Sequence, residues 1–334
     1  MPLQLPGSLT PSKVATFKEC ALAFRLSVID KLTEPPSLQA FKGTVVHRAL
    51  ELLMWEEKPG ARTPASAFGK LDRALAELLV GEEGAQLDLE GEALREFTED
   101  CRVLVGNYFQ LEDPNSVRVI GTELRLQVDI GLRLRGVIDR LELDDDDELV
   151  VTDYKTGRAP GVSHENSRLG GVHFYAFLCQ QLLGRRPARV QLLHLREPIA
   201  ISTVPDDQST NGLERQASAV WAAIARACST EDFRPKPGAL CEWCGFHAYC
   251  PARGGDLSLV HTVQGSPGAG RAGDVSPGAT SVDTTTIDVT EAEVLARDVG
   301  EATRRPSPDA VAPEGTRVLP GPLQFFPVSA ASTG

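Results

Sequence analysis

The chain has 334 residues, of which 42 % are hydrophobic and 24 % charged, enough length and apolar content to bury a sizeable core. No run approaches the roughly 18 consecutive apolar residues of a membrane span, and the first residues lack the basic and then apolar order of a signal peptide. Seven cysteines, an odd number, argue against a secreted disulfide framework. We therefore expect a globular, cytoplasmic protein without membrane contact.

The formal net charge of −12 argues against a nucleic-acid partner, because phosphate contacts come mostly from Lys and Arg. Residues 255–334 carry ten acids and five arginines, so the rest of the chain holds 29 basic and 36 acidic groups. Four of these acids form the run 144–147, a pattern typical of a solvated hairpin tip, and others are candidate metal ligands. The charge therefore does not exclude DNA as a partner.

The first part of the chain has the apolar spacing of helices. Ser12 precedes apolar residues at this spacing and predicts an N-capped helix that reaches residue 29. Further helical patterns cover 43–54, 64–80 and 92–110. We expect a helical N-terminal part.

From residue 117 the pattern changes to an alternation of polar and apolar side chains, which predicts an antiparallel meander of three strands. A helix, a strand and a last helix follow. This order indicates an α/β core in which helices flank a mixed sheet. The meander strands are 117–126, 129–143 and 149–154, and the later elements are 170–183, 188–195 and 213–227.

The composition changes after Cys250. From residue 254 the chain is rich in Gly, Pro, Ser, Thr and Ala, and its aromatic residues are Phe325 and Phe326. Such a segment buries too little apolar surface to offset its ordering entropy. We predict a folded domain over 8–253 and a disordered tail over 254–334.

An acidic cluster lies in the segment GVIDRLELDDDDELVVTDYKTG. Asp139 is near the end of one predicted strand, and Asp153 and Lys155 share a face of the next because they are two residues apart. Carboxylates are ligands that Mg²⁺ or Mn²⁺ prefers, and a nearby ammonium can orient a water and stabilise charge on a phosphate. The pattern predicts phosphodiester chemistry, although DxK also fits an ordinary strand end with a salt bridge.

These residues resemble the D…(D/E)xK signature of the PD-(D/E)XK nucleases, and VIDRLE and VTDYKTG resemble its RecB-like form. The resemblance covers about 12–250 and implies a restriction-endonuclease-like core. It further implies that His47, Asp139, Asp153 and the main-chain carbonyl of Tyr154 hold a Mg or Mn ion, while Lys155 assists the attacking water.

His47 lies in GTVVHRAL, where the RecB-like subgroup has a histidine ligand; a single helical histidine is otherwise an ordinary surface or core residue. Glu123 matches an acidic position before Asp139 and is a secondary candidate. Tyr175 matches the tyrosine of the helix after the DxK strand, but Gly171 stands where the family has glutamine.

A second cluster, C-x2-C-x5-C, is formed by Cys241, Cys244 and Cys250, and Cys20 is the candidate fourth ligand. Four thiolates suit zinc or an iron-sulfur cluster. The arrangement resembles AddB-type and CRISPR-associated RecB-like nucleases, which implies a 4Fe-4S cluster, with zinc as the alternative. Because the ligands close a loop of more than 200 residues, metal binding should couple to folding. We expect the other cysteines to be buried: Cys101, Cys179 and Cys228.

Aromatic and basic residues give weaker signals. Trp243 and Phe246 lie among the cysteines, and we expect them to shield the cluster. Eight basic residues are candidates to line a DNA groove, although each alone fits a plain solvated surface. Five follow the DxK strand, and three lie near the start of the chain: Arg158, Arg168, Arg185, Arg186 and Arg189, with Lys13, Lys18 and Arg25.

The sequence and the resemblance together predict a metal-dependent DNA exonuclease for recombination or repair, acting on single strands or duplex ends. Relatives work beside a superfamily 1 helicase; no GxxxxGK(S/T) motif is present here, so a motor would be another chain. One alternative is a catalytically silent DNA-binding or scaffold subunit. Another is a zinc-stabilised interaction module, for which the acidic cluster would be accidental.

Overall fold

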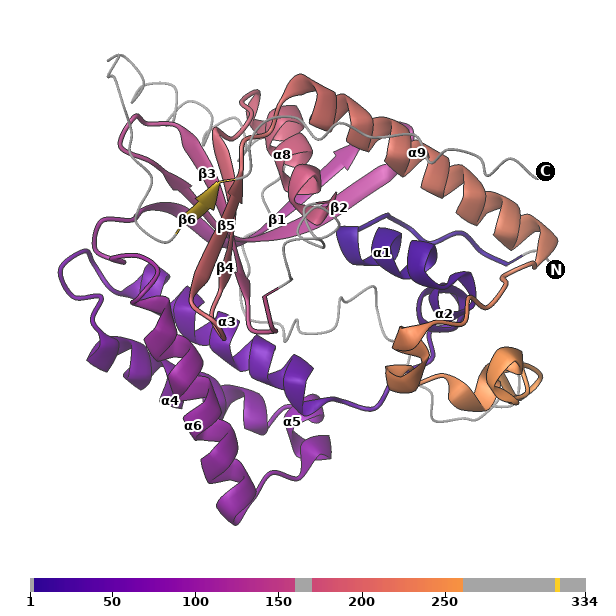
Figure 1. The fold of residues 1–334 in the computed structure, drawn as a ribbon, viewed down its shortest axis with the longest axis horizontal. Coiled ribbons are helices and arrows are strands. Elements are labelled where there is room, and N and C mark those ends of the chain that lie inside the picture. Colours follow the sequence, from indigo (N-terminus) through magenta and orange to yellow (C-terminus); the bar gives the residue numbers. More distant parts are fainter. Residues whose placement is uncertain (1–2, 160–169, 261–315, 319–334) are drawn as a thin grey trace, which may run out of the picture.

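A mixed sheet with helices on both faces forms the centre of the computed structural model, which describes residues 3–159, 170–260 and 316–318 (Figure 1). The strand order along the sheet follows the chain, from β1 to β6. The predicted α/β core is therefore confirmed. The strands are β1 (Arg118–Asp129), β2 (Arg133–Leu143), β3 (Leu149–Lys155), β4 (Arg189–His194), β5 (Ile199–Thr203) and β6 (Thr316–Val318).

Strands β1, β2 and β3 form the predicted antiparallel meander, while β4 runs parallel to β3. The connection from β3 to β4 contains α8, which packs on β1, β2 and β4. Strand β5 pairs antiparallel with β4, and β6 pairs parallel with β5. Neither β5 nor β6 was predicted, because each is five residues or fewer and carries little alternation.

Helices cover the two faces of the sheet in separate groups (Figure 1). One hydrophobic core lies between the sheet and α1, α8 and α9, and the other between the sheet and α3, α4 and α6. The helices are α1 (Pro11–Glu19), α2 (Ala21–Phe24), α3 (Leu38–Glu56), α4 (Pro64–Leu79), α5 (Glu82–Leu87), α6 (Gly91–Tyr108), α8 (Gly170–Leu183) and α9 (Asp207–Thr230).

The first predicted helix is interrupted at Cys20, which corrects the expectation of one continuous helix to residue 29. Cys20 has extended backbone angles, φ −156° and ψ 110°, so α1 ends there and α2 begins at the next residue. A π-helix (Arg25–Ile29) follows. The break lets Leu22 pack beside Phe246 in a small separate cluster while Phe24 joins the main core.

Cys241 lies in one of three short 3₁₀ helices, and Cys244 and Cys250 lie at their ends: Ala239–Trp243, His247–Tyr249 and Pro251–Arg253. Packing continues past the predicted domain end at 253, since Val260 is 1 % exposed and lies against Leu22 and Phe246. Most of the predicted disordered tail, 254–334, lies outside the described residues. In the described part of the chain, no helix has the length and apolar character needed to cross a bilayer.

Candidate active site

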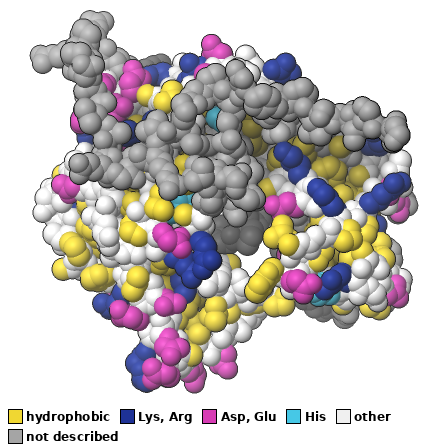
Figure 2. Space-filling model, in the orientation of Figure 1, with side chains coloured by type: hydrophobic (Ala, Val, Ile, Leu, Met, Phe, Trp, Pro, Cys, Tyr) yellow, Lys and Arg dark blue, Asp and Glu magenta, His cyan; other side chains and the backbone are white. Residues whose placement is uncertain are grey.

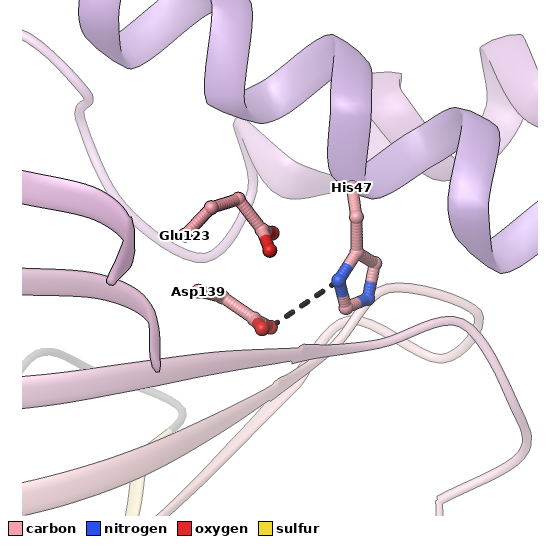
Figure 3. A group of neighbouring side chains, drawn as sticks. All are labelled: His47, Glu123 and Asp139. Atoms are coloured by element: carbon pink, nitrogen blue, oxygen red, sulfur yellow. Dashed lines mark ion pairs between the residues drawn. The ribbon is translucent and has the colours of Figure 1, made fainter. Parts of the chain in front are cut away.

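Three side chains from different elements converge at one point: His47 from α3, Glu123 from β1 and Asp139 from β2 (Figure 3). Each offers one ligand atom, and these atoms lie within 4.8 Å of one another. His47 Nδ1 is 3.4 Å from Asp139 Oδ2. An imidazole nitrogen and carboxylate oxygens are donors that suit a divalent cation.

Helix α3 carries His47 close to the end of β3. The Ser37 hydroxyl caps the helix by accepting a hydrogen bond from Ala40 N. At Gly43, an added Cβ would stand 3.2 Å from Thr156 Oγ1, so glycine permits the close approach of helix and strand. His47 follows one turn later, with its ring edge-on to that of Tyr154 at 5.9 Å between centroids.

Strands β2 and β3 separate at the site. Their ladder ends at the pair Arg140 and Thr152, whereas β3 goes on pairing with β4 through Lys155. Beyond the ladder, the Asp139 carboxylate accepts a hydrogen bond from Tyr154 N at 2.7 Å. The carboxylate thus takes the place of a backbone partner and is held at a fixed position between the strands.

Asp153 and Lys155 lie beside the group of three. Their side chains form an ion pair through Asp153 Oδ2 and Lys155 Nζ. Asp153 is 4 % exposed, while the Lys155 side chain is 45 % exposed and reaches solvent. The group of three does not include Asp153, which was predicted as a ligand. It includes instead Glu123, which the sequence marked only as a secondary candidate.

The carboxylates of the site are crowded. Burial first, and then the charges of Asp139, Glu51 and Asp153, raises the pKa of Glu123 to about 9. Burial also raises the pKa of Asp139 to about 6, with His47 acting in the opposite direction. A bound divalent cation would offset this repulsion. The donor set therefore fits such an ion.

Two further features accompany the cluster. Glu123 has φ 49°, in the left-handed region, which costs about 1 kcal/mol for a residue with a side chain. Burial, followed by the charges of Asp153, Asp139 and Glu123, raises the pKa of Tyr175 on α8 well above the ordinary value. Of the two secondary candidates, Glu123 belongs to the group of three, and a role for Tyr175 stays a prediction.

A family model described as the PD-(D/E)XK nuclease superfamily matches residues 8–251. The chain belongs to this superfamily. No curated protein matches. The solved structures that are similar to the chain include the following two. A crystal structure of an exonuclease candidate from Eubacterium rectale has 12 % identity and a TM-score of 0.45, covering 71 % of this chain and 87 % of its own. The protein SSO0001 has 13 % identity and a TM-score of 0.33, covering 75 % and 89 %.

The four predicted cluster cysteines of this PD-(D/E)XK nuclease chain line one cavity of about 330 Å³. Two of the sulfurs accept backbone hydrogen bonds: Lys236 N donates to Cys20 Sγ at 3.5 Å, and Gly238 N donates to Cys241 Sγ at 3.3 Å. Such donors stabilise thiolates. The other cysteines are buried as expected: Cys101, Cys179 and Cys228.

The two aromatic residues between the cysteines differ in exposure. Phe246 is 4 % exposed and packs with Leu22 and Leu26, as expected of a shielding residue. Trp243 is 87 % exposed, so the prediction that it shields the cluster is wrong.

The arginines proposed for a DNA groove are largely paired with acids. Figure 2 likewise shows basic side chains interspersed with acidic ones over α4, α5 and α6 rather than a continuous basic patch on that face. Arg168 lies outside the described residues, and the pairs are Arg158 with Glu197, Arg185 with Glu148, and Arg186 with Asp207.

Proposed function

We propose that the protein is a Mg²⁺- or Mn²⁺-dependent deoxyribonuclease that hydrolyses phosphodiester bonds. The observation that carries the proposal is the convergence of His47, Glu123 and Asp139, with ligand atoms within 4.8 Å, beside the ion pair of Asp153 and Lys155. Crowded carboxylates with raised pKa values gain most from a cation.

In this proposal the cation is held by His47, Asp139 and Asp153 together with the Tyr154 carbonyl, and Glu123 adds a further carboxylate. Bound there, a divalent ion would lower the pKa of a water and polarise a phosphate oxygen. The Lys155 ammonium is fixed beside Asp153 but open to solvent, so it can hold the attacking water and balance charge on the phosphate.

The finer assignments rest on the RecB-like form of VIDRLE and VTDYKTG. They are an exonuclease mode on single strands or duplex ends, a place in recombination or repair, and a superfamily 1 helicase as partner chain. Because three of the arginines proposed for a DNA groove form ion pairs with acids, we propose that DNA is held mainly at the cation.

We also propose that Cys20, Cys241, Cys244 and Cys250 bind a 4Fe-4S cluster. Four thiolates suit zinc as well as an iron-sulfur cluster, and the split of the ligands between Cys20 and residues 241–250, with all four lining one cavity, is what favours the cluster. Anaerobic purification followed by iron, sulfide and zinc analysis separates the two metals.

The nuclease proposal is tested with end-labelled single- and double-stranded DNA and Mn²⁺. We expect the wild type to degrade DNA, and Asp153→Ala and Lys155→Ala to lose at least about a thousandfold in rate. Asp145→Ala, in the exposed 144–147 run, is the matched control and should keep full activity. Equal degradation by the wild type and both site variants would reveal a contaminant, and an inactive, folded wild type would indicate a scaffold subunit.

A further inference from the structure

Behind the candidate site, on the other side of β3, a fully buried arginine bonds to the strand. Arg140 has 0 % exposure, and its Nη1 donates to the Tyr154 hydroxyl at 2.9 Å. Arg140 directly follows Asp139, and Tyr154 stands between Asp153 and Lys155. This hydrogen bond is thus one of those that link the two chain segments that carry the acidic site.

The guanidinium group is tightly surrounded. Its Nη1 and Nη2 both donate to the Glu112 carboxylate, with the Nη2 to Oε2 distance at 3.0 Å. Its Nε faces Glu142 as an ion pair, and Nη2 also donates to Thr152 Oγ1 at 3.2 Å. These partners lie on β2, on β3 and in the loop after α6, and together they hold the Arg140 side chain in one conformation.

Stability alone does not account for this network. Burying an arginine with two carboxylates costs desolvation energy that the ion pairs repay only in part, and well-packed apolar residues commonly do as well. What the network supplies is a fixed position for Tyr154. Strand β4 pairs with one edge of β3 through Lys155. On the other edge the β2–β3 ladder ends at Arg140 and Thr152, so Tyr154 is held there by its hydrogen bonds to Asp139 and Arg140.

We propose that Arg140 is a positioning residue for the cation site and acts through Tyr154. By holding the tyrosine hydroxyl, it fixes the Tyr154 main chain, whose N–H binds Asp139 at 2.7 Å and whose carbonyl is a proposed ligand. The Tyr154 ring also contacts the His47 ring. The inference rests on the proposed function, because it assigns the network a role in holding the cation.

The test compares two conservative variants. Tyr154→Phe removes the hydroxyl bonded to Arg140 and keeps the ring. Tyr108→Phe is the matched control: Tyr108 is also fully buried and also accepts a hydrogen bond from Arg140 Nη1, at 3.2 Å, but it lies on α6 and has no chain link to the site. Both variants avoid the uncompensated buried charges that removal of Arg140 would leave.

We expect Tyr154→Phe to weaken Mn²⁺ binding, measured by calorimetry, and to raise the Mn²⁺ concentration for half-maximal cleavage, each by about tenfold. At saturating Mn²⁺ the rate should recover to within about threefold of the wild type. Tyr108→Phe should change both Mn²⁺ constants by less than about twofold, although both variants should unfold at lower temperature.

Equal losses of Mn²⁺ affinity in the two variants, or no loss in either, would overturn the inference, because a network with a purely structural role would affect stability alone or affect both hydroxyls alike. The proposed function fails separately. If the wild type binds Mn²⁺ but cleaves no DNA, the nuclease proposal falls, while weaker binding in Tyr154→Phe would still support the role of Arg140.

Discussion

The acidic site and the cysteine region are each assembled from residues far apart in the sequence, but they are held together differently. The acidic site stands on α3, β1, β2 and β3, all anchored in the two main cores. The cysteine region consists of short 3₁₀ helices over a cluster of four buried residues: Leu22, Leu26, Phe246 and Val260. We therefore expect the cysteine region, with so little core, to depend on metal binding to fold, and the acidic site to form by packing before any ion binds.

The largest effect of this difference should follow from loss of a cysteine ligand. We expect Cys20→Ala to lose the bound metal and most of the soluble yield, because a ligand set that closes a long loop contributes to folding. Chelating the divalent ion of the acidic site in the wild type should leave the yield and the circular dichroism spectrum unchanged. Metal content per chain and soluble yield are the measurements.

Cys228→Ala is the control for that substitution. Cys228 is 2 % exposed and belongs to the main core near the same end of the molecule, but it does not line the cysteine cavity. It should keep its metal and lose only about 1 kcal/mol of stability. Unchanged metal content in Cys20→Ala would show that Cys20 is not a ligand.

A smaller effect should separate the two aromatic residues of the cysteine region. Phe246→Ala removes a buried ring from a cluster of four, and we expect it to lower the free energy of unfolding by about 3 kcal/mol. Trp243→Ala, at an 87 % exposed position, should change it by less than about 0.5 kcal/mol. Urea denaturation measures both. The opposite order would mean that Trp243, and not Phe246, covers the cluster.

Much of the fold could be predicted because it follows from local periodicity. The alternation over β1 to β3 predicted the meander, and the two-residue spacing of Asp153 and Lys155 placed both side chains on one face. The superfamily match over 8–251 agrees with what the DxK segment implied.

What the sequence could not predict depends on contacts between distant segments. Cys20 lies in an unbroken helical pattern, yet its backbone is extended and the helix ends there. Nothing about a glutamate predicts the left-handed backbone at Glu123. The sequence therefore could not predict that its carboxylate lies beside His47. Arg140 was missed as well, because its partners are spread from Glu112 to Tyr154 and a lone arginine in a strand signals nothing.

The smallest predicted effect is on the pH dependence of Tm, and it arises because folding brings the acidic groups together before a cation binds. In the metal-free protein, folding raises the pKa of Asp139 to about 6 and that of Glu123 to about 9, so the folded state favours the protonated acids. An acid whose pKa is higher in the folded than in the unfolded state stabilises the fold fully at a pH below its unfolded pKa. This stabilisation is lost as the pH rises through the folded pKa. The Tm of the chelated protein should therefore fall between pH 5 and pH 9, and Mn²⁺ should restore it most at the upper end.

Glu123→Gln sharpens this prediction, because it removes the group whose pKa lies highest. Its Tm in chelator should fall less between pH 6 and pH 9 than that of the wild type, by a few degrees, since about 1 kcal/mol moves Tm by roughly 2–4 °C in a domain of this size. Buried Glu142, whose pKa is raised to about 7, contributes a fall in the same direction to both proteins and so cancels in the comparison. Glu96→Gln, at an exposed position on α6, should follow the wild-type curve. Parallel curves for Glu123→Gln and the wild type would mean that folding does not raise the pKa of Glu123. The packing of α3 against β1 and β2 would then not crowd the carboxylates of the metal-free site, and the prediction would be wrong.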